Sequence, residues 1–137
     1  MKNNFNRLAE ALIAEGKLEK AGAVLTKLEK SIPMKVLGYV PQDVETANLW
    51  FKVGNKDKGR EVAKFAFENI KDEADYYLSQ PADIFPSVSD DLQYTLYEMR
   101  NLTQWVTDGK EEDLAKEIET KFNEYYTRFV TRTGGQR

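Results

Sequence analysis

The sequence predicts an all-α fold of about six helices, arranged as three antiparallel helix pairs. Apolar residues recur every three or four positions through most of the 137-residue chain, which is the spacing of one helix face. No segment keeps the strict apolar–polar alternation of a half-buried β-strand. Three glycines, Gly16, Gly54 and Gly109, interrupt the periodicity, so each third of the chain has the pattern helix, glycine, helix.

The first predicted pair spans residues 3–33. Its first helix ends at Gly16, because glycine accepts the left-handed conformation that closes many helices. Its second helix ends before Pro33, since proline cannot continue a helix. The short turn makes the two helices antiparallel and packs their apolar faces together. Those faces consist of Phe5, Leu8, Ala9, Leu12, Ile13, Leu18, Ala21, Val24, Leu25, Leu28 and Ile32.

The second predicted pair spans residues 41–79. Pro41 suits the first turn of a helix, and the acidic side chains that follow it are favourable at the positive helix N-terminus. Gly54 ends this helix; the next begins near Asp57 and stops before Pro81. The apolar positions of the pair are Val44, Ala47, Trp50, Phe51, Val53, Val62, Ala63, Phe65, Ala66, Phe67 and Ile70.

The third predicted pair spans residues 89–131 and follows a loop at residues 80–88. Ile84 and Phe85 are apolar, so we expect this loop to dock on the helices. Residues 89–91, Ser-Asp-Asp, offer side chains that would cap the N-terminus of the next helix. The apolar positions of the pair are Leu92, Leu96, Met99, Leu102, Trp105, Val106, Leu114, Ala115, Ile118, Phe122, Tyr125, Tyr126 and Phe129.

The end of the chain completes the predicted organisation. The acidic run at residues 111–113 suits the start of the last helix, and we interpret it as helix-stabilising charge rather than a catalytic pair. The sequence TRTGGQR at residues 131–137 is predicted to be disordered. We therefore expect one helical-repeat domain over residues 1–133, followed by a flexible tail at residues 134–137.

The first unit matches the pattern of a tetratricopeptide repeat, a helix pair of about 34 residues with small residues where the helices cross. The matching positions are Phe5, Leu8, Ala9, Leu12, Ala21, Leu25, Leu28 and Pro33. The second unit keeps Ala47, Trp50 and Gly59, and the third matches still less well. We expect a right-handed tetratricopeptide-like superhelix with divergent second and third units; the alternative is a plain six-helix bundle.

The composition removes several classes of function. The chain has no histidine and no cysteine, which excludes the common nucleophile–base pairs, disulfides and most zinc sites. A formal charge of −3 argues against a general nucleic-acid binder. No apolar run approaches the roughly 20 residues of a membrane span, and the Gly-Lys pairs at Gly16 and Gly109 lack the phosphate-loop motif. We expect a non-catalytic chain without cofactor or metal.

Aromatic residues are the strongest candidates for binding. Tyrosine is doubled at residues 76–77 and 125–126, and adjacent helical residues cannot both point inward, so one ring of each pair is expected at the surface. The two tryptophans are expected in the core. Helical-repeat proteins bind on a concave face lined by the first helix of each pair. On that basis, the residues predicted to contact a partner are Asn48, Tyr94, Arg100 and Asn101.

Four segments taken together resemble a known protein family. They are NNFNRLAEALIAEGKLEKAGAVLTKL, a long helix ending in DYYLS, LQYTLYEMRNLTQWV and DLAKEIETKFNEYYTRF. The combination resembles the C-terminal soluble region of bacterial multi-spanning membrane proteins of the protein O-mannosyltransferase-like class. The resemblance implies a periplasmic location, tethered to the inner membrane in the parent protein. It also implies that the membrane portion holds any transferase chemistry, with no catalytic residue in this chain.

Two functional hypotheses follow. The first is a non-catalytic interaction domain that binds a partner protein, an acceptor polypeptide or the membrane domain of its own protein. The alternative is a purely structural cap, with no ligand of its own, whose groove is filled by the loop at residues 80–88. The positions of Ile84 and Phe85 distinguish the two. An independent enzyme would need a carboxylate or lysine pair with shifted pKa values in a pocket.

Overall fold

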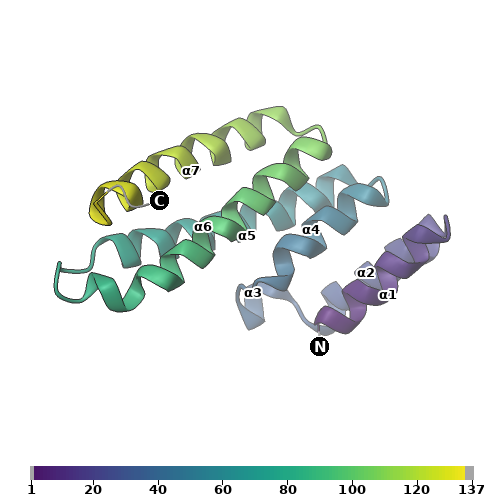
Figure 1. Cartoon of the computed structure of the whole chain (residues 1–137). Coiled ribbons are helices and arrows are strands. Elements are labelled where there is room, and N and C mark those ends of the chain that lie inside the picture. The colour runs from purple at the N-terminus through teal and green to yellow at the C-terminus, as the bar shows by residue number, and fades with distance from the viewer. Residues whose placement is uncertain (1, 135–137) are drawn as a thin grey trace. The chain divides into compact units, whose positions relative to one another are not determined.

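The computed structural model describes residues 2–134, and every regular element within them is a helix (Figure 1). The helices are α1 (Lys2–Ala14), α2 (Leu18–Ser31), α3 (Met34–Leu37), α4 (Gln42–Lys52), α5 (Lys56–Leu78), α6 (Phe85–Asp108) and α7 (Glu112–Arg132). Six of these described helices are long, and α3 is about one turn. The predicted all-α class is therefore confirmed.

The chain divides into two compact units, Met1–Ala66 and Phe67–Arg137, and the boundary falls within α5. The first unit contains α1 to α4 and the first part of α5, whereas the second contains the rest of α5 with α6 and α7. The single domain over residues 1–133 and the superhelical arrangement of three helix pairs stay predictions.

In the first unit, α1 packs against both α2 and α4. Two fully buried alanines, Ala9 on α1 and Ala21 on α2, lie at the positions where the repeat pattern requires small residues. The predicted apolar face is wrong at two points, since Leu8 is 52% exposed and Leu18 is 44% exposed. The remaining buried apolar side chains of the unit are Leu25, Leu28, Val44, Ala47, Leu49, Trp50, Val62, Ala63 and Ala66.

The three predicted glycines each follow the end of a helix, as expected. Gly16 and Gly54 have φ values of 78° and 90°, so both take the left-handed conformation that ends the preceding helix. At the third position the glycine also ends its helix, as the C-cap of α6, but the left-handed residue is the next one. Gly109 keeps a φ of −77°, and the left-handed residue is Lys110, with a φ of 63°.

The segment between the first two predicted pairs contains a helical turn that the sequence pattern does not reveal. Pro33 precedes α3, and Gly38, with a φ of 91°, follows it. Pro41 lies immediately before α4 rather than inside its first turn. Four residues are too few to establish a helical periodicity, so α3 is recognisable only in the folded chain.

The start of α6 differs from the prediction. The helix begins at Phe85, with Pro86 in its first turn, so the Ser-Asp-Asp sequence at residues 89–91 lies inside the helix and does not cap it. Proline suits this place because its fixed φ is helical and its missing N–H needs no partner there. Phe85 docks as expected, being 5% exposed, with the Arg132 guanidinium 4.0 Å from its ring centroid, whereas Ile84 is 43% exposed.

The end of α7 also corrects the prediction. Thr131 and Arg132 belong to the helix and are not disordered, because Arg132 is anchored. Its guanidinium donates a hydrogen bond of 2.8 Å to the Leu78 carbonyl oxygen at the end of α5. Gly134, the first residue of the predicted tail, forms a turn with a φ of 75°. Residues 135–137 of that tail lie outside the described residues.

In the second unit, α6 and α7 pack against each other as an antiparallel hairpin joined by residues 109–111 (Figure 1). The acidic run at residues 111–113 begins α7 as predicted. The contact between α6 and α7 is apolar, and hydrogen bonds join both helices to the second part of α5. The buried apolar side chains of the unit are Phe67, Ile70, Ala74, Leu78, Phe85, Leu92, Leu96, Met99, Leu102, Val106, Leu114, Ala115, Ile118, Tyr125 and Phe129.

Gly59, near the start of α5, lies against the ring of Phe51 on α4. A Cβ on Gly59 would lie 2.7 Å from the Cδ1 and Cε1 atoms of Phe51, which is closer than carbon atoms approach in real contacts. The missing side chain therefore permits the close approach of the two helices. A small residue early in the second helix of a pair is what the repeat pattern predicts.

We expect Gly59→Ala to lower the free energy of unfolding, because the overlap with Phe51 outweighs the roughly 1 kcal/mol that alanine gains over glycine in a helix. In a Phe51→Ala background, the same substitution should raise it. Gly22→Ala in α2 is the control, since nothing lies within 4 Å of its added Cβ. Urea unfolding measures all of these variants, and a stabilising Gly59→Ala in the otherwise wild-type chain would contradict the close approach.

Tyr125 gives the second unit a predicted pH dependence. The side chain is fully buried, and burial together with the nearby Asp75 carboxylate raises the pKa of its phenol above the ordinary value of 10.0. The folded chain therefore keeps a proton that the unfolded chain loses above about pH 10, so stability falls as the pH rises through that value. In Tyr125→Phe this decline should be shallower, and in the exposed control Tyr126→Phe it should match wild type. Urea unfolding at several pH values checks both.

Candidate functional site

An open groove lies between α6 and α7 in the second unit. Its volume is about 600 Å³. Eight residues line it: Arg100, Thr103, Gln104, Thr107, Glu119, Phe122, Asn123 and Tyr126. Four come from each helix, and in both helices they are spaced by three, one and three residues. This spacing places the four side chains of each helix on one side of it.

The packing of the hairpin explains why these residues border a groove. Leu102 and Val106 of α6, and Leu114 and Ile118 of α7, are almost fully buried. Burial of those positions fixes the rotation of each helix about its axis. The lining residues follow at the edge of the contact, where side chains of both helices face the same open space.

An aromatic pair forms the α7 wall of the groove. The rings of Phe122 and Tyr126 are stacked, with their centroids 5.9 Å apart and their planes inclined by 11°. Tyr126 is 42% exposed, so part of this surface is accessible. Stacked rings offer a flat apolar surface next to a hydroxyl group, which suits contact with apolar or aromatic side chains.

Polar groups occupy the rest of the groove. The hydroxyls of Thr103 and Thr107 donate to main-chain carbonyl oxygens of their own helix, at 3.0 and 2.8 Å, and the Gln104 amide donates to Asp108. By contrast, no residue in the described part of the chain pairs with the Arg100 guanidinium or the Asn123 amide. Both are available to a ligand.

Of the four predicted contact residues, three are on α6 in the second unit and Asn48 is in the first unit. Arg100 lines the groove, and Tyr94 and Asn101, seven residues apart, lie on another side of α6. Tyr94 is 55% exposed. Asn48 belongs to the first unit and is only 3% exposed. Its amide donates to a Glu45 carboxylate oxygen at 3.3 Å, leaving little surface for a partner; a binding role for these residues stays a prediction.

Sequence reasoning missed most of the groove. Phe122 and Tyr126 were both assigned to the apolar face of the last helix, because aromatic residues at helical spacing are usually buried. The doubled tyrosines were the useful signal. Tyr125 is fully buried and Tyr126 is exposed, as expected of neighbours in a helix, and Tyr76 is 62% exposed. Of the tryptophans, Trp50 is in the core as predicted, whereas Trp105 is only half-buried.

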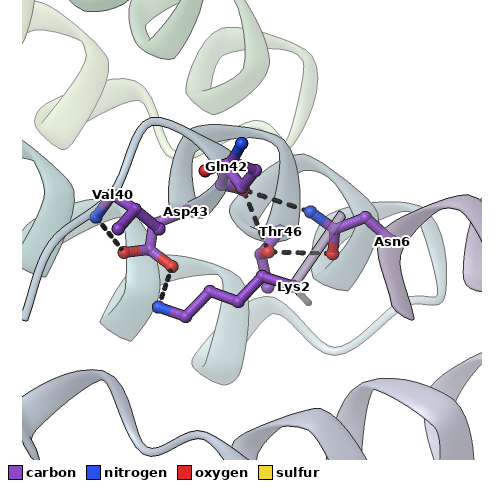
Figure 2. Close-up of polar contacts among 6 residues, drawn as sticks. All are labelled: Lys2, Asn6, Val40, Gln42, Asp43 and Thr46. Carbon is purple, nitrogen blue, oxygen red and sulfur yellow. Dashed lines mark hydrogen bonds and ion pairs between the residues drawn. The ribbon is translucent and has the colours of Figure 1, made fainter. Parts of the chain in front are cut away.

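The first unit contains a buried ion pair between α1 and α4 (Figure 2). The Lys2 ammonium lies 2.8 Å from a carboxylate oxygen of Asp43, and the two side chains are 6% and 4% exposed. The second carboxylate oxygen accepts a hydrogen bond of 3.0 Å from the Val40 main-chain N–H. The Asp43 carboxylate is thus bonded through both oxygens.

Asn6 extends this network by one helical turn (Figure 2). Its amide donates to the Gln42 carbonyl oxygen at 3.2 Å, and its own oxygen accepts from the Thr46 hydroxyl at 2.9 Å. An adjoining cavity of about 30 Å³ is lined by Lys2, Asp43, Trp50 and several aliphatic side chains. That volume is about the size of one water molecule, so the network is structural rather than a ligand site.

We expect Lys2→Met to destabilise the chain by about 3 kcal/mol, because it leaves the Asp43 carboxylate buried without its counter-ion. Adding Asp43→Asn should restore most of that loss. Lys17→Met is the control, since Lys17 pairs with Glu15 at an exposed position and such pairs contribute little. A double-mutant cycle by urea unfolding tests this. Equal effects of Lys2→Met and Lys17→Met would show that the buried pair is not stabilising.

The described residues form neither a metal-binding cluster nor a membrane-spanning helix. Among residues 2–134, no group of three or more acidic side chains is arranged to hold a metal ion. No helix in that part of the chain has the length and apolar character needed to cross a membrane. Comparisons with protein-family models, curated proteins and solved structures gave no match.

Proposed function

We propose that this chain is a non-catalytic interaction domain that binds a peptide segment of a partner protein in the α6–α7 groove. The groove itself carries the proposal. Its volume of about 600 Å³ lies in the range of known ligand sites. It combines a tyrosine and an arginine, the residue types that contribute most binding energy at protein interfaces.

The chemistry of the lining favours a particular kind of peptide. The stacked rings of Phe122 and Tyr126 suit an apolar or aromatic anchor residue. The Arg100 guanidinium suits a carboxylate, which it can bind through two parallel hydrogen bonds. The Asn123 amide can bond the main chain of an extended segment. We therefore propose a segment with an apolar anchor close to an acidic residue.

We further propose that the helices form a tetratricopeptide-like superhelix within the periplasmic region of a membrane glycosyltransferase-like protein. The packing of α1 on α2 and of α6 on α7, and the close approach at Gly59, are compatible with helix pairs of that kind. The resemblance of the sequence to that family supports the location. In that setting the bound segment belongs to an acceptor polypeptide, to another protein or to the membrane domain itself.

The alternative, a structural cap with no ligand, depends on a groove filled by the chain's own loop. Neither Ile84 nor Phe85 is among the residues that line the α6–α7 groove. Phe85 instead packs under Arg132. The groove is therefore open to a partner, which favours binding over the structural role.

Selection of short random peptides displayed on phage, with the full chain immobilised, tests the proposal. Selected peptides should bind with micromolar dissociation constants in fluorescence anisotropy. Phe122→Ala and Tyr126→Ala should each weaken binding about tenfold, or about 1.4 kcal/mol, because each removes half of the ring pair. Arg100→Gln should weaken peptides with an acidic residue and leave neutral ones unchanged.

Tyr76→Ala on α5 is the matched control, since it removes an exposed tyrosine that does not line the groove. Amide shifts in NMR spectra of the complex should cluster at the lining residues. If no peptide can be selected, the structural cap is favoured. If the selected peptides bind all the groove variants as tightly as wild type, the groove is not the site.

A further inference from the structure

Three exposed tyrosine rings of the same unit lie outside the groove. Tyr76 on α5, and Tyr94 and Tyr97 on α6, are 62%, 55% and 59% exposed. We call these three residues the tyrosine face. The two helices are adjacent here, since the Thr95 hydroxyl of α6 donates to a carboxylate oxygen of Glu73 on α5 at 3.3 Å. Tyr94 and Tyr97 are neighbours, with ring centroids 6.4 Å apart.

The segment that carries this face is strongly acidic. Residues 67–99 contain eight Asp and Glu side chains and a single basic residue, Lys71. That lysine is engaged elsewhere, 3.2 Å from Glu68 and 4.6 Å from the centroid of the Phe67 ring. The other nineteen basic side chains of the chain lie outside the segment. Along the sequence, the segment that carries the tyrosine face is therefore strongly acidic, and the first basic residue after it is Arg100.

The pKa of Tyr77, which is adjacent to Tyr76, is affected by these acidic side chains. Burial raises the pKa of its phenol, and the carboxylates of Glu73, Asp91 and Glu98 raise it further. These acidic groups come from both α5 and α6, so carboxylates of the two helices lie near Tyr77. Asp91 is the exposed one of the three, since Glu98 is 6% exposed and Glu73 accepts from Thr95.

We propose that the tyrosine face binds an arginine-rich segment of a partner protein. A guanidinium can stack on an aromatic ring and bond a carboxylate at once, and no other side chain combines these contacts as well. The chain uses this contact internally, where the Arg132 guanidinium lies 4.0 Å from the centroid of the Phe85 ring. Within the described residues, no lysine or arginine lies over the exposed rings of Tyr76, Tyr94 or Tyr97.

Fluorescence anisotropy with a labelled peptide of alternating arginine and glycine tests the proposal on the full chain. The peptide should bind, and more weakly as salt is added, because exposed charges are screened. Tyr94→Leu with Tyr97→Leu should weaken binding about tenfold, since each substitution removes a ring face but keeps an apolar side chain. The Tyr→Phe pair at the same positions should bind as wild type does.

Charge is tested with matched pairs of substitutions. Asp90→Asn with Asp91→Asn should weaken binding several-fold, whereas Glu112→Gln with Asp113→Asn, an equal charge change at the start of α7, should not. An equal loss in both pairs would overturn the proposal in favour of non-specific attraction, as would equal binding of an alternating lysine–glycine peptide.

Sedimentation of the chain alone tests whether a second copy of the chain, and not another protein, occupies the tyrosine face. If the chain associates with itself and Tyr94→Leu with Tyr97→Leu abolishes that association, the surface belongs to a second copy and the proposal is overturned. The proposal is independent of the α6–α7 groove. Phe122→Ala should leave the arginine peptide bound, so the failure of one site is distinguishable from the failure of the other.

Discussion

The apolar contact between α6 and α7 is the constraint on which both proposed surfaces depend. Burial of Leu102 and Val106 on α6, and of Leu114 and Ile118 on α7, fixes how each helix is rotated. Once that rotation is fixed, every other position on α6 is assigned to the groove, to the neighbouring α5 or to solvent. The polar and aromatic side chains on these helices are therefore held by a rigid scaffold and not by loops.

Helix periodicity and turn residues made much of the fold predictable, because both are local properties of the chain. Gly16 and Gly54 needed only their own backbone freedom to be recognised as helix ends. The helix start that was predicted wrongly has a different cause, which is burial of a neighbouring side chain. At the start of α6, Pro86 and the Ser-Asp-Asp sequence both offered acceptable helix starts, and the earlier start places Phe85 in the core. Propensity alone does not choose between two such starts; burial does.

The candidate sites depended on contacts that no local pattern reveals. Arg100 was predicted as a polar position of α6, but the other wall of the groove that it lines comes from α7, about 20 residues further along. Asn48 satisfied the same polar pattern, yet it is buried and bonded to Glu45. Likewise Lys2 and Asp43 carry no sequence signal for an ion pair across 41 residues. A polar residue on a helix becomes structural or functional only through the elements that pack around it.

The two surfaces of the second unit differ in the charge they select, although α6 contributes to both. The groove is lined by one cation, Arg100, and one carboxylate, Glu119, and among the described residues Arg100 lacks a partner, so a carboxylate of the bound segment can pair with Arg100. On the tyrosine face, Asp91 and its acidic neighbours favour a basic segment. A basic peptide in the groove would meet Arg100, and an acidic peptide on the tyrosine face would meet carboxylates. Because like charges at close range disfavour binding, the two proposals predict different partners for the two surfaces.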